Sequence, residues 1–135
     1  MQSELVYQEL GILMEWTIKL HENERYAEIH TSGIADQQSS LDMAKALAST
    51  LSQYAVTKVL VDYRGIESVL GAPASVYDRP QQFREMGMPA GVKVAEIVRP
   101  EHREHFKFLE VVASNRGFNL AVFYDDATAL EWLLK

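Results

Sequence analysis

Residues 58–66 read Lys-Val-Leu-Val-Asp-Tyr-Arg-Gly-Ile, and the first part of this stretch decides the fold. After Lys58, residues 59–63 form a run of β-branched and other apolar side chains that is interrupted near its end by Asp62. A continuous apolar run of this length is typical of a strand that is buried on both faces. Strands of that kind lie in the middle of a sheet and pair in parallel, so we expect a central parallel strand here.

Two segments of alternating polarity precede this strand. Residues 14–20 alternate apolar and polar side chains, and residues 25–32 alternate again after a polar turn at residues 21–24. A period of two is the mark of a strand with one buried face, so the pair predicts a β-hairpin. The preceding residues, 1–13, are treated as an N-terminal extension of uncertain structure.

Helices are predicted between the strands that follow. Ser39, Ser40 and Asp42 offer N-capping oxygens to a first long helix with small and apolar residues at helical spacing. The later elements are a short helix near 80–86, a strand at 92–98, a helix from Pro100 to about 115, a strand at 120–124 and a helix capped by Asp125. Because such alternation requires right-handed crossovers, we expect an α/β fold. It comprises one mainly parallel sheet with helices packed on it and an N-terminal β-hairpin, in a single domain over residues 1–135.

The composition excludes several classes of protein. The chain has no cysteine, which excludes disulfides and thiolate ligands, and fits a reducing compartment. Lys and Arg number 13 against 19 Asp and Glu, so the net charge of −6 disfavours a nucleic-acid partner. The N-terminus is acidic and no apolar run approaches the roughly 20 residues that span a bilayer. We therefore expect a cytoplasmic protein that binds no nucleic acid.

The sequence holds no complete catalytic motif. Neither a phosphate-binding glycine pattern nor a G-x-S-x-G serine is present, so we expect no cofactor and no enzyme activity. His102 and His105 are three apart but match no metalloprotease motif, and we interpret them as part of a solvated helix start. Asp62 and Glu67 could form an acid-base pair, although a structural role in the loop is the better interpretation.

The segment at residues 65–79 is predicted to be a loop with an unusual number of apolar side chains. It either folds into the core or forms the wall of a pocket. Since it leaves the carboxyl end of the central strand, where open α/β sheets bind ligands, we expect the binding site here. The side chains expected to contact a ligand or partner are Asp62, Tyr63, Arg64, Glu67, Ser75 and Tyr77.

Several short motifs resemble those of STAS domains, the fold of the SpoIIAA-like anti-sigma-factor antagonists. Residues 33–36 (Gly-Ile-Ala-Asp) resemble the G-x-x-D turn of that family, and residues 62–66 resemble its D-x-S-G-hydrophobic segment. In that register Gly71 lies where the antagonists carry a phosphorylated serine, and Ala72 replaces a second serine. The C-terminal half, from residue 92 onward, is similar to small STAS-like proteins related to the CRAL-TRIO lipid-transfer fold.

The resemblance implies two functions, both without catalysis. The first is binding of a small apolar or lipid-like ligand, gated by the loop at 65–79. The alternative is a regulatory protein-interaction module that lacks the usual phosphoacceptor serine, unless Ser68 or Ser75 provides a shifted switch. Peripheral membrane contact and a homodimer are left open.

Overall fold

The computed structural model describes residues 13–71 and 73–135, and it shows a sheet with strand order β1-β2-β3-β4-β5. The strands are β1 (Glu15–His21), β2 (Tyr26–Ala35), β3 (Lys58–Val69), β4 (Lys93–Ile97) and β5 (Asn119–Phe123). The helices are α2 (Gln37–Tyr54), α3 (Pro73–Tyr77), α4 (Arg79–Glu85), the 3-10 turn η1 (Pro100–His102), α5 (Arg103–Asn115) and α6 (Asp126–Leu133). β1 and β2 pair antiparallel and the other neighbours pair in parallel, so the predicted hairpin and mainly parallel sheet are confirmed.

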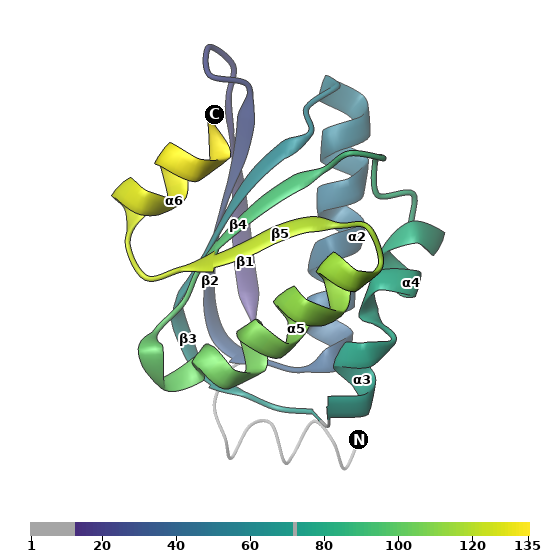
Figure 1. The fold of residues 1–135 in the computed structure, drawn as a ribbon, viewed down its shortest axis with the longest axis vertical. Coiled ribbons are helices and arrows are strands. Elements are labelled where there is room, and N and C mark those ends of the chain that lie inside the picture. Colours follow the sequence, from purple (N-terminus) through teal and green to yellow (C-terminus); the bar gives the residue numbers. More distant parts are fainter. Residues whose placement is uncertain (1–12, 72) are drawn as a thin grey trace.

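The helices form unequal layers on the two faces of the sheet (Figure 1). The parallel strands follow one another in sequence order, and right-handed crossovers between such strands place every connecting helix on the same face. Accordingly α2, α3, α4 and α5 lie on one side, and of the helices in the described residues only α6 lies on the other. No helix within residues 13–71 and 73–135 is long and apolar enough to cross a bilayer.

Strand β3 contributes to a hydrophobic core on each face of the sheet because its side chains alternate between the faces. Val59 and Val61 belong to the large core beneath α2 and α5, whereas Leu60 belongs to a smaller core beneath α6. The smaller core includes Ala129 and Leu133 of α6. This double burial explains why residues 59–61 form an uninterrupted apolar run.

The prediction of a loop at residues 65–79 is wrong for most of that segment. β3 does not end at Tyr63 but continues through Gly65 to Val69, paired with the end of β2, and α3 follows almost at once. A Cβ atom at Gly65 would lie 2.2 Å from the backbone oxygen of Thr31, so only glycine lets the two strands approach this closely. The apolar side chains of this segment are therefore strand and helix residues, such as Ile66, which is fully buried.

The start of α2 also differs from the prediction. The N-cap is Asp36, whose Oδ1 accepts hydrogen bonds from the backbone N–H of Ser39 at 2.8 Å and from its hydroxyl at 2.5 Å. Ser39 in turn accepts from the backbone N–H of Asp36, which completes a reciprocal capping box. Ser39 thus takes part in the cap from the third helical position, whereas Ser40 and Asp42 lie inside the helix instead of capping it. The N-terminal extension through residue 12 and the prediction for Ala72 lie outside the described residues.

Candidate functional site

A small cavity lies between the sheet and the helices α2, α4 and α5. Its volume is about 50 Å³. Apolar side chains make up most of its wall: Met43, Ala44, Leu47, Val61, Phe83, Met88, Val92, Val94, Leu109, Phe118 and Leu120. Because a single water needs roughly 10–15 Å³ by this kind of measure, the cavity can hold a few waters or a ligand of only a few heavy atoms.

Four polar residues line this otherwise apolar cavity: Ser40 of α2 and three residues from other elements. Tyr63 comes from β3, Arg79 from the first turn of α4 and Glu96 from β4. Arg79 is only 6% exposed and Glu96 only 3%. Within the described part of the chain, the Nε of Arg79 and the Oε1 of Glu96 have no hydrogen-bond partner, and no carboxylate lies within 4.0 Å of the Arg79 guanidinium. Unpaired polar atoms at this depth are costly, so they need an explanation.

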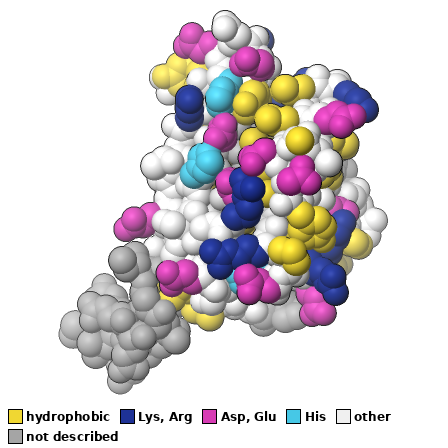
Figure 2. Space-filling view, turned by 90° about the vertical axis from the view of Figure 1, so that its left-hand side faces the viewer, with side chains coloured by type: hydrophobic (Ala, Val, Ile, Leu, Met, Phe, Trp, Pro, Cys, Tyr) yellow, Lys and Arg dark blue, Asp and Glu magenta, His cyan; other side chains and the backbone are white. Residues whose placement is uncertain are grey.

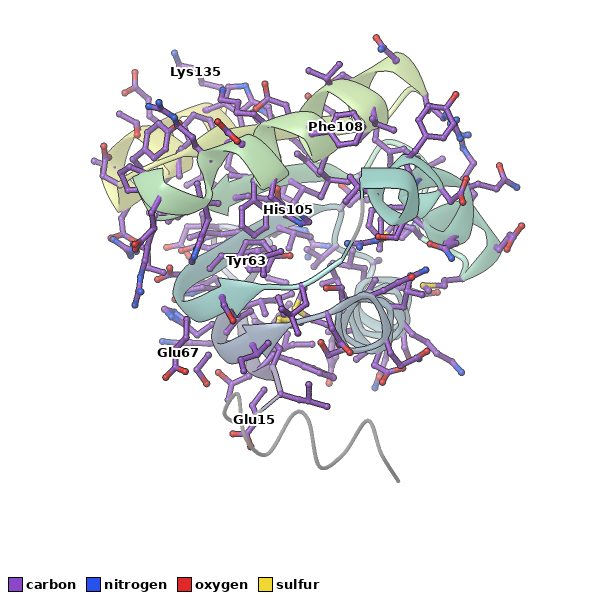
Figure 3. All side chains as sticks on the ribbon, turned by 90° about the horizontal axis from the view of Figure 1, so that it is seen from below. Glu15, Tyr63, Glu67, His105, Phe108 and Lys135 are labelled. Carbon is purple, nitrogen blue, oxygen red and sulfur yellow. The ribbon has the colours of Figure 1, made fainter. Side chains whose placement is uncertain are left out.

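Burial dominates the electrostatics of these groups. It raises the pKa of Glu96 to about 8, and the positive charge of Arg79 offsets only part of that shift. Burial also raises the pKa of Tyr63 and lowers that of Arg79. His105 of α5 is half-buried, and this burial lowers its pKa to about 4; Figure 3 labels it together with Tyr63. At neutral pH this region therefore contains one cation, Arg79, beside a protonated carboxyl and a neutral imidazole.

The predicted site residues Asp62, Tyr63 and Arg64 do not lie together. Consecutive strand residues point to opposite faces, so Tyr63 lines the cavity while Asp62 and Arg64 lie on the α6 side of the sheet. There Arg64 donates to Oδ1 and Oδ2 of Asp62 at 3.0 and 2.9 Å, and its Nη2 also donates to Asp126 at the start of α6. These contacts lower the pKa of Asp62 despite partial burial.

The same face of the sheet carries further charged groups. Glu28 pairs with both His21 and His30, and His30 Nδ1 lies 3.5 Å from Asp62. Figure 2 shows this side of the molecule, where acidic, basic and histidine side chains lie next to one another. The ion pairs are mutual, so this surface has little free charge to offer a ligand.

The remaining predicted site residues occupy separate places. Glu67 is exposed on the outer part of β3 (Figure 3). Ser75 is half-buried in α3, and Tyr77 ends that helix with 53% of its surface exposed. The guanidinium of Arg116 lies 4.5 Å from the centre of the Tyr77 ring. Of the predicted set, only Tyr63 therefore lines the cavity.

The sequence prediction missed Arg79 and Glu96. The sequence does indicate Glu96 as a candidate, because it is the only carboxylate in the mostly apolar strand segment at residues 92–98. A charged residue in a strand covered on both faces must be buried with its charge unsolvated, which marks a candidate site. Arg79 gave no comparable signal, since an arginine at the start of a short helix is ordinary.

A second candidate surface lies on the outside of α3 and α5, which pack against each other. We call it the α3–α5 surface; it comprises Tyr77, Phe108 and Val111, next to the turn at Gly71. Phe108 is 38% exposed and Val111 55%, and a shallow hollow between the helices is lined by Gly71 and Phe108 among others. Large exposed apolar side chains that cluster in this way are typical of protein interaction sites.

Comparison with solved structures shows that the fold is SpoIIAA-like. An uncharacterized protein from the DUF3478 family with a SpoIIAA-like fold, from Shewanella loihica PV-4, aligns with a TM-score of 0.57 at 19% identity, over 89% of this chain and 93% of that chain. An anti-sigma factor antagonist from Mycobacterium paratuberculosis aligns with a TM-score of 0.63 at 9% identity, over 90% and 95% of the two chains. No protein-family model and no curated protein matches the sequence.

These matches confirm the STAS-like fold expected from the motifs near Gly33 and Asp62. They give no support to the resemblance of the C-terminal half to the CRAL-TRIO fold, since neither matched structure is described as such a protein. At identities this low the matches establish architecture alone.

Proposed function

We propose that this protein is a non-enzymatic regulatory module that binds another protein through the α3–α5 surface. The observation that carries the proposal is the exposure of Tyr77, Phe108 and Val111 on neighbouring helices beside Gly71. A buried-core explanation does not apply to these side chains, because each has more than a third of its surface in solvent. Aromatic residues and arginine are the side chains most often responsible for binding energy at protein interfaces, and Tyr77 with Arg116 fits that preference.

The matched antagonist structure supports a protein as the occupant. That protein is described as an anti-sigma factor antagonist, and we propose a partner of the same kind, an anti-sigma factor, for this chain. In the register of the STAS motifs the α3–α5 surface begins at Gly71, the position of the phosphoacceptor in those antagonists. Gly71 has no hydroxyl, so phosphorylation at this position does not control the binding proposed here.

The test uses a charge introduced at the centre of the surface. Val111→Asp keeps α5 helical but places a carboxylate among apolar side chains, and it should weaken partner binding by about tenfold or more. Tyr54→Asp is the matched control, since Tyr54 is similarly exposed, at 48%, but lies on α2. Partners recovered by affinity purification are identified and titrated against the three proteins, with circular dichroism to verify folding.

Equal affinity of the wild type and Val111→Asp for every recovered partner would contradict the proposal. Sedimentation of the purified protein distinguishes a homodimer, which uses the same surface, from a heterologous partner. We do not propose a lipid-like ligand, because the comparisons do not support one and a cavity of about 50 Å³ is too small for a fatty-acid chain.

A further inference from the structure

The cavity contains a buried cation in an otherwise apolar setting. Arg79 has no carboxylate within 4.0 Å among the described residues, and its Nε has no hydrogen-bond partner there. Transferring a guanidinium from water to such a place is costly unless an anion or several acceptors surround it. The protein nevertheless directs Arg79 inward from α4, with only 6% of the residue exposed.

Glu96 compensates this charge only in part. Its Oε1 also lacks a partner in the described part of the chain, and burial holds its pKa at about 8. The carboxyl is therefore protonated near neutral pH and can donate a hydrogen bond. A guanidinium N–H and a carboxyl O–H thus face the same small cavity, and both are donors.

The rest of the cavity wall is mostly apolar and suits the hydrocarbon part of a ligand. Met43, Leu47 and Phe118 present hydrocarbon and thioether surface with no further charge. At roughly 10–15 Å³ for each water-sized group, the volume of about 50 Å³ leaves room for about three to five heavy atoms.

We propose that this cavity is a binding site for a short-chain aliphatic monocarboxylate, of the size of acetate or propionate. One carboxylate oxygen accepts from Arg79 Nε, the other accepts from Glu96, and the short carbon chain lies against the apolar wall. Two charge-assisted hydrogen bonds to a carboxylate fit the donors that are left over, whereas a cation or a neutral apolar molecule leaves them unpaired. The inference is independent of the α3–α5 surface and of any partner protein.

The methionines provide a local readout. Met43 and Met88 line the cavity, whereas Met14 is buried in the same core without lining it. The full chain, labelled with ¹³C at the methionine methyl groups, is titrated with sodium propionate at pH 6.5, and separately with propionamide, propylamine and sodium chloride. We expect saturable shifts of the Met43 and Met88 methyl signals with propionate, none for Met14, and binding of propionamide weaker by about tenfold or more.

Two variants complete the test. Arg79→Met removes the guanidinium and should weaken propionate binding by at least about tenfold. If that variant does not fold, Ala44→Leu keeps Arg79 but fills the cavity from α2, and it should abolish the propionate-dependent shifts. The proposal is overturned by the absence of saturable shifts in the wild type, by equal binding of propionamide, or by full binding to Ala44→Leu. Partner binding at the α3–α5 surface affects none of these outcomes.

Discussion

Replacing Glu96 by glutamine should make the protein more stable at neutral pH and leave it almost unchanged in mild acid. Glutamine has nearly the shape of a protonated glutamate, so the substitution removes the ionisation and little else. In the folded protein the pKa of Glu96 is about 8, against 4.5 for an ordinary glutamate. The folded state therefore keeps a proton that the unfolded chain loses.

The sign and size of the effect on stability follow from this difference in the pKa of Glu96. A raised carboxyl pKa stabilises the folded state fully below pH 4.5, and that stability is lost as the pH rises towards 8. The loss amounts to about 1.4 kcal/mol for each pH unit, or about 3 kcal/mol by pH 7 and about 5 kcal/mol in all. Since whole domains are stable by only about 5–15 kcal/mol, an effect of this size is readily measured.

His105 contributes a pH dependence of stability in the opposite direction, because burial lowers its pKa to about 4. Its contribution is present above the ordinary pKa of 6.5 and is lost as the pH falls towards 4, so it offsets the slope from Glu96 in mild acid. The wild-type stability curve should therefore be nearly flat below pH 6.5 and fall above it. Subtracting the wild-type curve from that of Glu96→Gln removes the contribution of His105, because both proteins contain it.

The assay is urea unfolding at pH 5, 6, 7 and 8 for the wild type, Glu96→Gln and the control Glu67→Gln, whose side chain is exposed. The free energy of unfolding of Glu96→Gln should exceed that of the wild type by an amount that grows by about 3 kcal/mol or more between pH 5 and 8. The curve of Glu67→Gln should run parallel to the wild type. A difference for Glu96→Gln that stays constant across the range would refute the reasoning, since Glu96 would then ionise as it does in the unfolded chain.

Two further substitutions test the fold. Gly65→Ala places a Cβ atom 2.2 Å from the Thr31 oxygen and should lower the free energy of unfolding by about 1–3 kcal/mol, so an unchanged urea midpoint would show that the strands can separate at no cost. Asp36→Ala removes the N-cap of α2 and should cost about 1 kcal/mol in the same assay. Asp42→Ala, an exposed position within α2, should cost clearly less, and an equal loss would contradict the assignment of the cap.

The sequence was sufficient to predict the architecture because each element carries a local pattern. Alternation in residues 14–20 and 25–32 reflects one buried face, and residues 59–61 are apolar without a break because α6 covers the second face. The cap at Asp125 was also predictable from sequence: its Oδ1 accepts from the backbone N–H of Thr128 at 2.8 Å. Patterns of this kind depend on neighbours along the chain.

The cavity depends on distant residues and was only partly predictable. Arg79 of α4 and Glu96 of β4 line the same cavity only because of the tertiary packing, and nothing in either local sequence specifies that arrangement. The end of β3 was misjudged for a similar reason, since residues 65–69 extend the strand by pairing with the end of β2. Small residues near Gly65 suggest a loop, whereas here the glycine permits a close strand approach.

Strand β3 joins two surfaces that have no contact with each other. Tyr63 borders the internal cavity, while the next residue, Arg64, holds Asp126 at 3.0 Å and so fixes the first turn of α6 from the opposite side of the sheet. A backbone displacement in a strand moves successive side chains together, although they point in opposite directions. The alternation that divides the predicted site in two thus gives adjacent residues of one strand two separate roles, one in the wall of the cavity and one in the anchoring of α6.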